Sequence, residues 1–301
     1  MIKAFDEIVK YAKEKGPKTL AVAVAQDAEV LNAVNSAKDL GIADAILVGD
    51  KEEIEKAAAS CGVDIAKFTI IDEKDKVEAC RKAVNLISEG KADIVMKGLV
   101  DTAIILKAVL AEEAGLRTGN VLSHVAVFEV NGYDRLFIVT DAAMNIAPNL
   151  EQKKQIIENA VKVAHAMGNM EPKVAVLAAV EKVNPKMQAT LDADALVEMN
   201  KKGEIKGCLI GGPFALDNAV SLEAAKHKGI DHPVAGHADI LMVPQIEAGN
   251  MLYKSMVFFA KAQNAGIIVG AKVPIVLTSR ADSDIAKLNS IAIGVLMADI
   301  K

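Results

Sequence analysis

The sequence predicts an α/β fold made of two domains, because apolar strand-like runs alternate with helical stretches over most of its 301 residues. TLAVAVA (19–25), AILVG (45–49) and ADIVMKG (92–98) are runs of this kind, and each precedes a stretch with apolar residues at helical spacing. Strands that are apolar throughout are typical of a parallel sheet covered by helices on both faces. A hydrophobic content of 52% is enough for a full core in each domain.

Capping residues indicate where the first helices begin and end. Asp27 and Asp50 follow the first two runs, where a carboxylate can accept hydrogen bonds from the first amides of a helix. Gly41 and Gly62 are suited to end these two helices, because glycine adopts the left-handed conformation that often closes a helix. The first half of the chain therefore predicts strand–helix units in direct succession.

A different pattern interrupts the alternation at VLSHVAVFEV (121–130) and RLFIVT (135–140). These runs flank NGYD (131–134), a sequence suited to a hairpin turn. A long helix follows, and Asn149 and Gln152 at its start have the spacing of a capping box. Strand–helix units then resume, so the hairpin separates two sets of units and indicates two α/β domains.

The first domain is expected to comprise residues 1–143 and 272–301, and the second residues 144–271. The last strand-like run, VPIVL (273–277), and the helix after it would return to the first domain. This division places both hairpin strands in the first domain.

The composition argues against nucleic acids and membranes as partners. A net charge of −5 provides no basic face for a phosphate backbone, and aromatic residues make up 3% of the chain, with no tryptophan. No apolar run is long enough to span a bilayer, and the N-terminal MIKAFDEIVKYAKEKG is too charged for a signal peptide. We therefore expect a soluble cytoplasmic protein.

The sequence contains no pattern for a metal ion or a bound nucleotide. His227, His232 and His237 are five apart around a proline and a glycine, which is not a metal-ligand spacing. Neither GxGxxG nor GxxxxGK[ST] occurs. Cys208 could carry an acyl group, but a buried, inert thiol is the simpler interpretation, and the three cysteines without a CxxC motif suit a reducing compartment.

A candidate anion site follows VPIVL (273–277). Ser283 is a natural N-cap for the next helix, and Arg280 lies just before it. A guanidinium beside a helix N-terminus suits a phosphate, because its planar fork can pair with two oxygens. Alternatively, Arg280 is a surface residue paired with Asp282, and Asp284 only favours the helix dipole. Spacing alone leaves both interpretations open.

Two further pairs of residues are candidates for substrate binding. Lys97 and Gly98 end a strand, where parallel sheets bind ligands and where glycine lets the backbone approach a ligand closely. Asn250 and Lys254 are four apart on one helical face directly after a strand. A solvated helix start explains the second pair equally well.

From about residue 19 to its end, the sequence closely resembles the phosphate acetyltransferase/butyryltransferase family, and its butyryl-type branch in particular. The segments that carry this resemblance are KGLVDTAIILKAVL (97–110), LRTGNVLSHVAVFEV (116–130), VAGHADILMVPQIEAGNMLYKSM (234–256) and GAKVPIVLTSRADS (270–283). Their combination in this order is specific.

The resemblance implies two α/β domains with a cleft between them, similar to isocitrate and isopropylmalate dehydrogenases. It also implies reversible conversion of butanoyl-CoA and phosphate to butanoyl phosphate and CoA, by direct attack in a ternary complex. CoA and phosphate would be substrates, with no metal and no permanently bound cofactor. Family members are homo-oligomers, commonly built on dimers, and operate beside a carboxylate kinase, here a butyrate kinase.

The resemblance also assigns catalytic roles at the candidate anion site. Arg280 would position phosphate, and Ser279 would hydrogen-bond near the reacting thioester. Acetyl-type members carry a catalytic aspartate six positions after this arginine, where the present chain has Ala286. Asp282 or Asp284 would then replace that base, with Asp282 preferred. The expected substrate-binding residues are Lys97, Gly98, Asn145, Gly249, Asn250 and Lys254.

Three alternatives compete with butanoyl transfer. The first is the same reaction on acetyl-CoA. The second is a non-catalytic acyl-CoA-sensing module, against which the Ser279-Arg280 pair argues. The third is a metal-dependent hydroxyacid dehydrogenase of the same fold, which would need a cluster of aspartates that the sequence does not offer.

Overall fold

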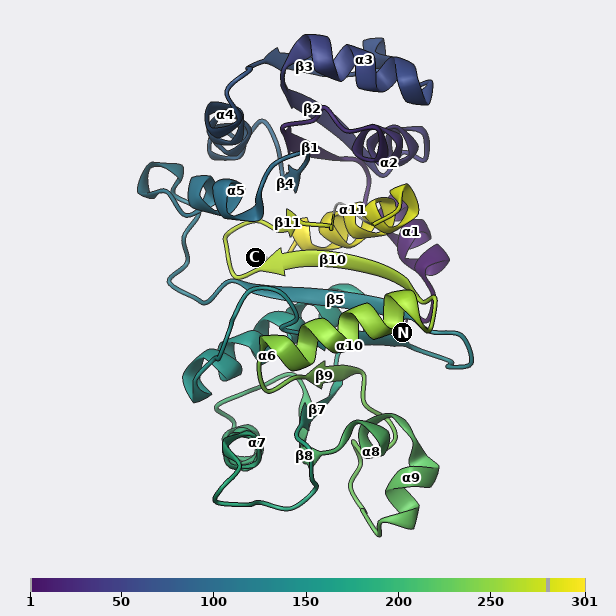
Figure 1. Cartoon of the computed structure of the whole chain (residues 1–301), viewed down its shortest axis with the longest axis vertical. Helices are drawn as coiled ribbons and strands as arrows, with labels where there is room; N and C mark the ends of the chain where they lie inside the picture. The colour runs from purple at the N-terminus through teal and green to yellow at the C-terminus, as the bar shows by residue number, and fades with distance from the viewer. Residues whose placement is uncertain (1, 280–281, 301) are drawn as a thin grey trace. The chain divides into compact units, whose positions relative to one another are not determined.

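The computed structural model describes residues 2–279 and 282–300. Residue contacts divide the chain into two compact units. The N-terminal unit is Phe5–Asn120 with the residues from Ala265 onward, and the central unit is Val121–Asn264 with the residues up to Ala4. Strands and helices alternate in both units (Figure 1), so the predicted α/β fold class is confirmed.

The sheet of the N-terminal unit is mainly parallel. Its strands are β1 (Lys18–Ala23), β2 (Ala43–Gly49), β3 (Thr69–Asp72), β4 (Ile94–Lys97), β10 (Gln263–Val269) and β11 (Ile275–Val276). Their order is β3-β2-β1-β4-β11-β10, and all neighbours are parallel except β11 and β10. The carboxyl ends of β1, β4 and β11 therefore lie at one edge of this sheet.

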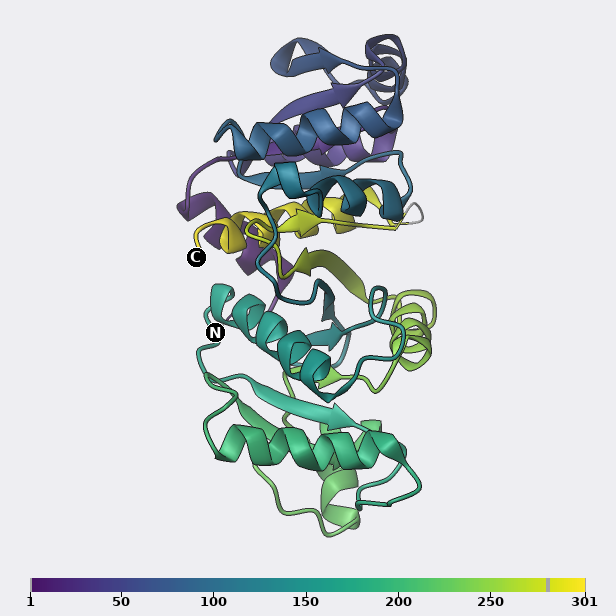
Figure 2. The same ribbon diagram turned by 90° about the vertical axis from the view of Figure 1, so that its left-hand side faces the viewer.

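Helices cover both faces of this sheet. They are α1 (Phe5–Glu14), α2 (Ala28–Asp39), α3 (Lys51–Cys61), α4 (Lys76–Ser88), α5 (Thr102–Val109) and α11 (Asp284–Ala298), with short 3-10 helices η1 (Ile65–Lys67) and η2 (Glu112–Ala114). Figure 1 shows α4 and α5 on one side of the strands and α2 and α11 on the other, and Figure 2 looks onto the α4 side. The predicted caps are confirmed, because Asp27 accepts a hydrogen bond from the Val30 amide and Asp50 from the Glu52 amide, both at 3.0 Å.

The sheet of the central unit combines a hairpin with parallel strands. Its strands are β5 (Ser123–Glu129), β6 (Leu136–Thr140), β7 (Lys173–Leu177), β8 (Leu209–Phe214) and β9 (Ile240–Met242). Their order is β5-β6-β9-β7-β8, with β5 and β6 antiparallel and the other neighbours parallel. The predicted turn over residues 131–134 joins β5 to β6 and is confirmed.

The helices of the central unit bury an apolar core on its sheet. They are α6 (Leu150–Ala166), α7 (Gln188–Lys201), α8 (Leu216–Val220), α9 (Leu222–His227) and α10 (Ile246–Phe258). Buried side chains of the strands, including Phe128, Phe137 and Phe214, pack with Ala219 of α8 and Ala225 of α9, and α10 covers the same core. The predicted capping box between Asn149 and Gln152 begins α6.

The hairpin belongs to the central unit by its contacts. β6 pairs in parallel with β9, which joins the hairpin to the sheet that carries residues 240–242. The division expected from the sequence placed the hairpin in the first domain. The pairing of β6 with β9 connects segments about 100 residues apart, so no local sequence pattern indicates it. The expected domain boundaries, after residues 143 and 271, stay a prediction.

The N-cap of α4 offers a test of how its helix is stabilised. The Asp75 carboxylate accepts hydrogen bonds from the amides of Val77 and Glu78, both at 2.9 Å. Asp75→Ala should lower the free energy of unfolding by about 1 kcal/mol, because these two amides lose their acceptor. Urea denaturation measures the change. Asp75→Asn keeps an acceptor and should stay close to the wild type, and equal losses in both variants would contradict the capping role.

Candidate active site

The residues that follow β1, β4 and β11 form the first part of the candidate site. In a parallel sheet, ligands bind beyond the carboxyl ends of the strands. Gly98 follows β4 directly, and its amide donates a hydrogen bond to the Ala23 carbonyl oxygen at 2.8 Å. A Cβ atom at Gly98 would lie 2.1 Å from the Val24 carbonyl oxygen. Glycine is therefore required here by the neighbouring backbone of the N-terminal unit itself.

Lys97 places a positive charge at the end of β4. Its side chain is 6% exposed, and its ammonium donates hydrogen bonds to the carbonyl oxygens of Gly98 and Val100, each at 3.2 Å. Because a buried ammonium is costly without partners, these carbonyl groups fix the charge at the strand end. The site thus contains a fixed cation within the first turn after β4.

Hydrogen bonds between Ser279 and Asp282 close the segment after β11, and these two residues define what is called the Ser279 turn. The Ser279 amide donates to Asp282 Oδ2 at 2.7 Å, and the Asp282 amide donates to the Ser279 carbonyl oxygen at 3.1 Å. Asp282 is 8% exposed, whereas Ser279 is exposed. The Asp282 carboxylate therefore closes the turn and leaves Ser279 at the surface. Arg280, the expected phosphate-binding residue, lies outside the described residues.

The first turn of α11 continues this arrangement. Ser283 caps the helix, as expected, and its hydroxyl accepts a hydrogen bond from the Ala286 amide at 3.2 Å. Asp284 is half-buried, and its amide donates to Glu29 Oε2 at 3.1 Å. Ala286, at the position of the acetyl-type aspartate, is buried.

Lys287 is a site residue that sequence reasoning missed. It is 3% exposed, and its ammonium donates a hydrogen bond to the Asp282 carbonyl oxygen. The bond holds the turn that presents Ser279, and it adds a second buried cation to the strand ends of this unit. A signal existed in the sequence, because Lys287 is a single lysine in the strongly apolar helix DIAKLNSIAIGVLMA (284–298).

The remaining expected residues lie in the central unit, around the loop that follows β6. Both Asp141 carboxylate oxygens accept hydrogen bonds within this loop, and the Asn145 side chain donates to Oδ2 at 2.6 Å. The Asn145 amide group also donates to the Leu122 carbonyl oxygen at 2.9 Å. Asn145 therefore shapes the loop through its own contacts.

Helix α10 packs closely against the same loop. A Cβ atom at Gly249 would lie 2.6 Å from the Asp141 carbonyl oxygen, so only glycine allows this approach. The Asn250 side chain is exposed and donates to the Ala142 carbonyl oxygen at 3.3 Å. Lys254, one turn further along α10, is exposed. The structure thus brings Asn145, Gly249 and Asn250 together.

The buried thiol of Cys80 and the half-buried thiol of Cys208 are poor nucleophiles. Burial raises the pKa of the Cys208 thiol to about 11, and that of the Cys80 thiol to about 11 as well. Near neutral pH both side chains stay protonated, which supports the interpretation of Cys208 as an inert thiol. Over residues 2–279 and 282–300, no group of three or more His, Cys, Asp or Glu side chains is arranged to hold a metal ion.

No helix in the described part of the chain has the length and apolar character needed to cross a membrane.

Comparison with known proteins gives matches along nearly the whole chain. The family described as Phosphate acetyl/butaryl transferase matches residues 4–81 and 73–295. A phosphate butyryltransferase of Clostridium acetobutylicum is 54% identical over 301 residues, which is 100% of both chains. A phosphate acetyltransferase of Thermotoga maritima is 48% identical and covers 97% of this chain and 99% of its own.

A solved structure also matches nearly the whole chain. The crystal structure of a branched-chain phosphotransacylase from Enterococcus faecalis V583 matches with a TM-score of 0.82 and 35% sequence identity. The match covers 94% of this chain and 99% of that one. The similarity therefore includes both compact units.

The close packing at Gly98 leads to a direct test. Gly98→Ala should destabilise the fold by about 1–3 kcal/mol, because the new methyl group would collide with backbone that cannot move without shifting β1. Thermal unfolding measures the loss. Gly294→Ala is the matched control, since the nearest atoms to its Cβ would be side-chain methyl groups, Val276 Cγ2 at 3.0 Å and Ile94 Cγ2 and Cδ1 at 3.5 and 3.6 Å, rather than backbone. Equal effects of the two substitutions would argue against a special constraint at Gly98.

Proposed function

The chain belongs to the phosphate acetyl/butaryl transferase family, and we propose that it transfers the butanoyl group of butanoyl-CoA reversibly to inorganic phosphate. The observation that carries this proposal is the 54% identity to a phosphate butyryltransferase along the full length of both chains. The chain is an acyltransferase by this membership, and the choice of butanoyl-CoA is the proposed part.

The reaction requires an anion to attack a thioester. A phosphate oxygen adds to the thioester carbonyl carbon, the C–S bond breaks, and the sulfur leaves as the CoA thiolate or thiol. Because both thioester and acyl phosphate are activated, direct transfer between bound substrates needs no covalent enzyme intermediate. The protein must hold both substrates in line and stabilise the oxyanion that forms.

The N-terminal unit contains groups suited to this task. The buried ammonium groups of Lys97 and Lys287 and the N-terminus of α11 provide positive potential for phosphate. We assign phosphate positioning to Arg280, and a hydrogen bond near the reacting thioester to the exposed Ser279. The Asp282 carboxylate supports this role, because it accepts a hydrogen bond from the Ser279 amide and so holds Ser279 in place.

The base for the reverse reaction is assigned to Asp282 or Asp284. In that direction the CoA thiol must lose its proton before it attacks butanoyl phosphate. Asp282 stays the preferred residue because it is next to Ser279, although one of its carboxylate oxygens already accepts the Ser279 amide. Asp284 is the alternative, since it is half-buried at the first position of α11.

The proposed substrate-binding residues divide into three kinds. Asn250 and Lys254 present side chains at the surface of α10, where they can contact anionic substrates. Gly98, Asn145 and Gly249 act by shaping the adjacent backbone. Lys97, described above, contributes charge.

The partners and setting complete the proposal. CoA and phosphate act as substrates, no cofactor stays bound, and the enzyme works in the cytoplasm beside a butyrate kinase that consumes butanoyl phosphate. A dimer-based homo-oligomer is supported by the apolar surface of α10 and the residue after it, where Met251 is 66%, Phe258 56% and Phe259 88% exposed. A single-chain mass in light scattering would refute the oligomer.

Acetyl-CoA is the competing substrate, because a phosphate acetyltransferase is 48% identical to this chain. Initial rates of CoA release with butanoyl-CoA and acetyl-CoA, each with and without phosphate, distinguish the two. We expect phosphate-dependent release and a kcat/KM at least about tenfold higher for butanoyl-CoA, since burying two additional methylene groups stabilises binding by about 0.8 kcal/mol each. A preference for acetyl-CoA would overturn the substrate, and no release by folded protein would favour the acyl-CoA sensor.

Substitutions at the turn after β11 test the mechanism. Ser279→Ala and Arg280→Ala should each lower kcat about 10²-fold or more, because each removes a donor from the reacting groups. Arg81→Ala is the matched control, since Arg81 is exposed and pairs only with Glu78 among the described residues. Wild-type kcat in both site variants would remove them from the mechanism.

The base is tested in the reverse reaction. If Asp282 is the base, Asp282→Asn should lower kcat about 10²-fold near pH 7, and Asp284→Asn should not. The deficit should shrink as the pH rises above about 8.5, because the CoA thiol then ionises without help. A pH profile of the wild-type shape in both variants would exclude both carboxylates, and a larger loss in Asp284→Asn would reverse the assignment.

A further inference from the structure

A cavity of about 460 Å³ lies in the central unit, and none of the residues that line it is assigned to the transfer reaction. Three helices begin at it, because Leu150 of α6, Gln188 of α7 and Gln245, the residue before α10, all line its wall. Its size is within the range of small-molecule sites. The cavity is therefore a candidate for a ligand other than those already discussed.

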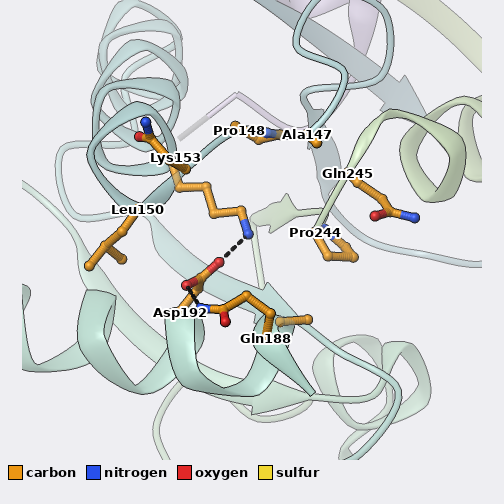
Figure 3. Close-up of a pocket in the computed structure, with 10 residues that line it drawn as sticks. Ala147, Pro148, Leu150, Lys153, Gln188, Asp192, Pro244 and Gln245 are labelled. Atoms are coloured by element: carbon orange, nitrogen blue, oxygen red, sulfur yellow. Dashed lines mark hydrogen bonds and ion pairs between the residues drawn. The ribbon is translucent and has the colours of Figure 1, made fainter. Parts of the chain in front are cut away.

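The floor of this cavity is a buried ion pair. Lys153 Nζ lies 2.5 Å from Asp192 Oδ2, and the two side chains are 6% and 9% exposed. Gln188 donates from Nε2 to Asp192 Oδ1 at 2.8 Å, so both carboxylate oxygens have a donor. Figure 3 shows the Lys153 ammonium in the middle of the lining residues, with Asp192 and Gln188 on one side and Pro244 and Gln245 across from them.

The ammonium has more donors than this pair uses. A lysine ammonium carries three N–H groups, and within the described chain Asp192 is the hydrogen-bond partner found for that of Lys153. Buried polar groups are normally satisfied by protein, water or ligand. Two N–H groups of Lys153 are thus available to an oxygen atom placed in the cavity.

Helix ends add further donors at the same place. α7 and α10 begin without a side-chain cap, whereas Asn149 caps α6. The first amides of an uncapped helix have no partner within that helix, although at α10 the Ile246 amide already donates to the Ile146 carbonyl oxygen at 3.0 Å, and each helix start carries about half a positive charge. Because Lys153 and Asp192 neutralise each other and Glu247 lies in the first turn of α10, the two uncapped ends leave at most about one positive charge, which matches a monoanion better than a dianion.

The rest of the lining is apolar. Pro148, Leu150, Ala189 and Pro244 provide aliphatic surface beside the polar groups. A ligand that fills the cavity would therefore carry a short apolar chain together with its charged end. An inorganic ion would leave this surface without a partner.

We propose that this cavity binds a small carboxylate with a short aliphatic chain, with its oxygens on the Lys153 ammonium and the first amides of α7. The site does not depend on the proposed transfer reaction, since none of its lining residues takes part in it. Binding would form hydrogen bonds only, without covalent change.

Titration calorimetry with butanoate as the probe tests this site in the full-length protein. The paired variant Lys153→Met with Asp192→Leu removes both charges together, so that no uncompensated charge stays buried. Ala189→Phe fills the cavity from a half-buried position and leaves the ion pair intact. Lys162→Met is the control, because Lys162 is an exposed lysine on the same helix α6.

Both cavity variants should weaken this butanoate site at least about tenfold, because charge-assisted hydrogen bonds or the space for the ligand are lost. Lys162→Met should bind like the wild type. Unchanged affinity in Ala189→Phe, or absence of binding to the wild type, would overturn the site. Tighter binding of inorganic phosphate than of butanoate at this site would overturn the assignment to a carboxylate. Phosphate-dependent CoA release by the same variants tests the transfer reaction separately.

Discussion

The close contact between Gly98 and the Val24 carbonyl oxygen constrains the candidate active site more than any other described contact. It joins the ends of β4 and β1 so tightly that no side chain fits between them. β11 pairs with the other side of β4, so β4 also fixes the position of the turn that follows β11. The Lys97 charge and the Ser279 turn are therefore placed by one stretch of sheet rather than by flexible loops.

Two buried lysines are used differently in the two units. In the N-terminal unit, Lys287 donates to the backbone carbonyl of Asp282 and places a buried positive charge beside a turn. In the central unit, Lys153 pairs with Asp192, so the pair has no net charge. Lys153 then offers a ligand only the N–H groups that the pair does not use. The first arrangement suits a multiply charged phosphate, and the second suits a weaker anion. Burial of the same residue type thus yields two different electrostatic environments.

Much of the fold could be predicted from local sequence signals. The caps at Asp27 and Asp50, the capping box at Asn149 and the turn over residues 131–134 depend on neighbouring residues, and the structure contains them. Pairing of β6 with β9 could not be predicted, because it joins distant segments. Lys153 and Lys287 were missed for a related reason, since the burial of a lysine depends on which elements pack around it. The three helix starts around the cavity likewise converge only in space.

The raised pKa values of Cys80 and Cys208 have a consequence for a protein that handles a thiol. Exchange between a protein thiol and the disulfide of CoA requires the protein sulfur as a thiolate. With both pKa values at about 11, less than about one thiol in a thousand is ionised near pH 7. These two cysteines should therefore resist mixed-disulfide formation with oxidised CoA.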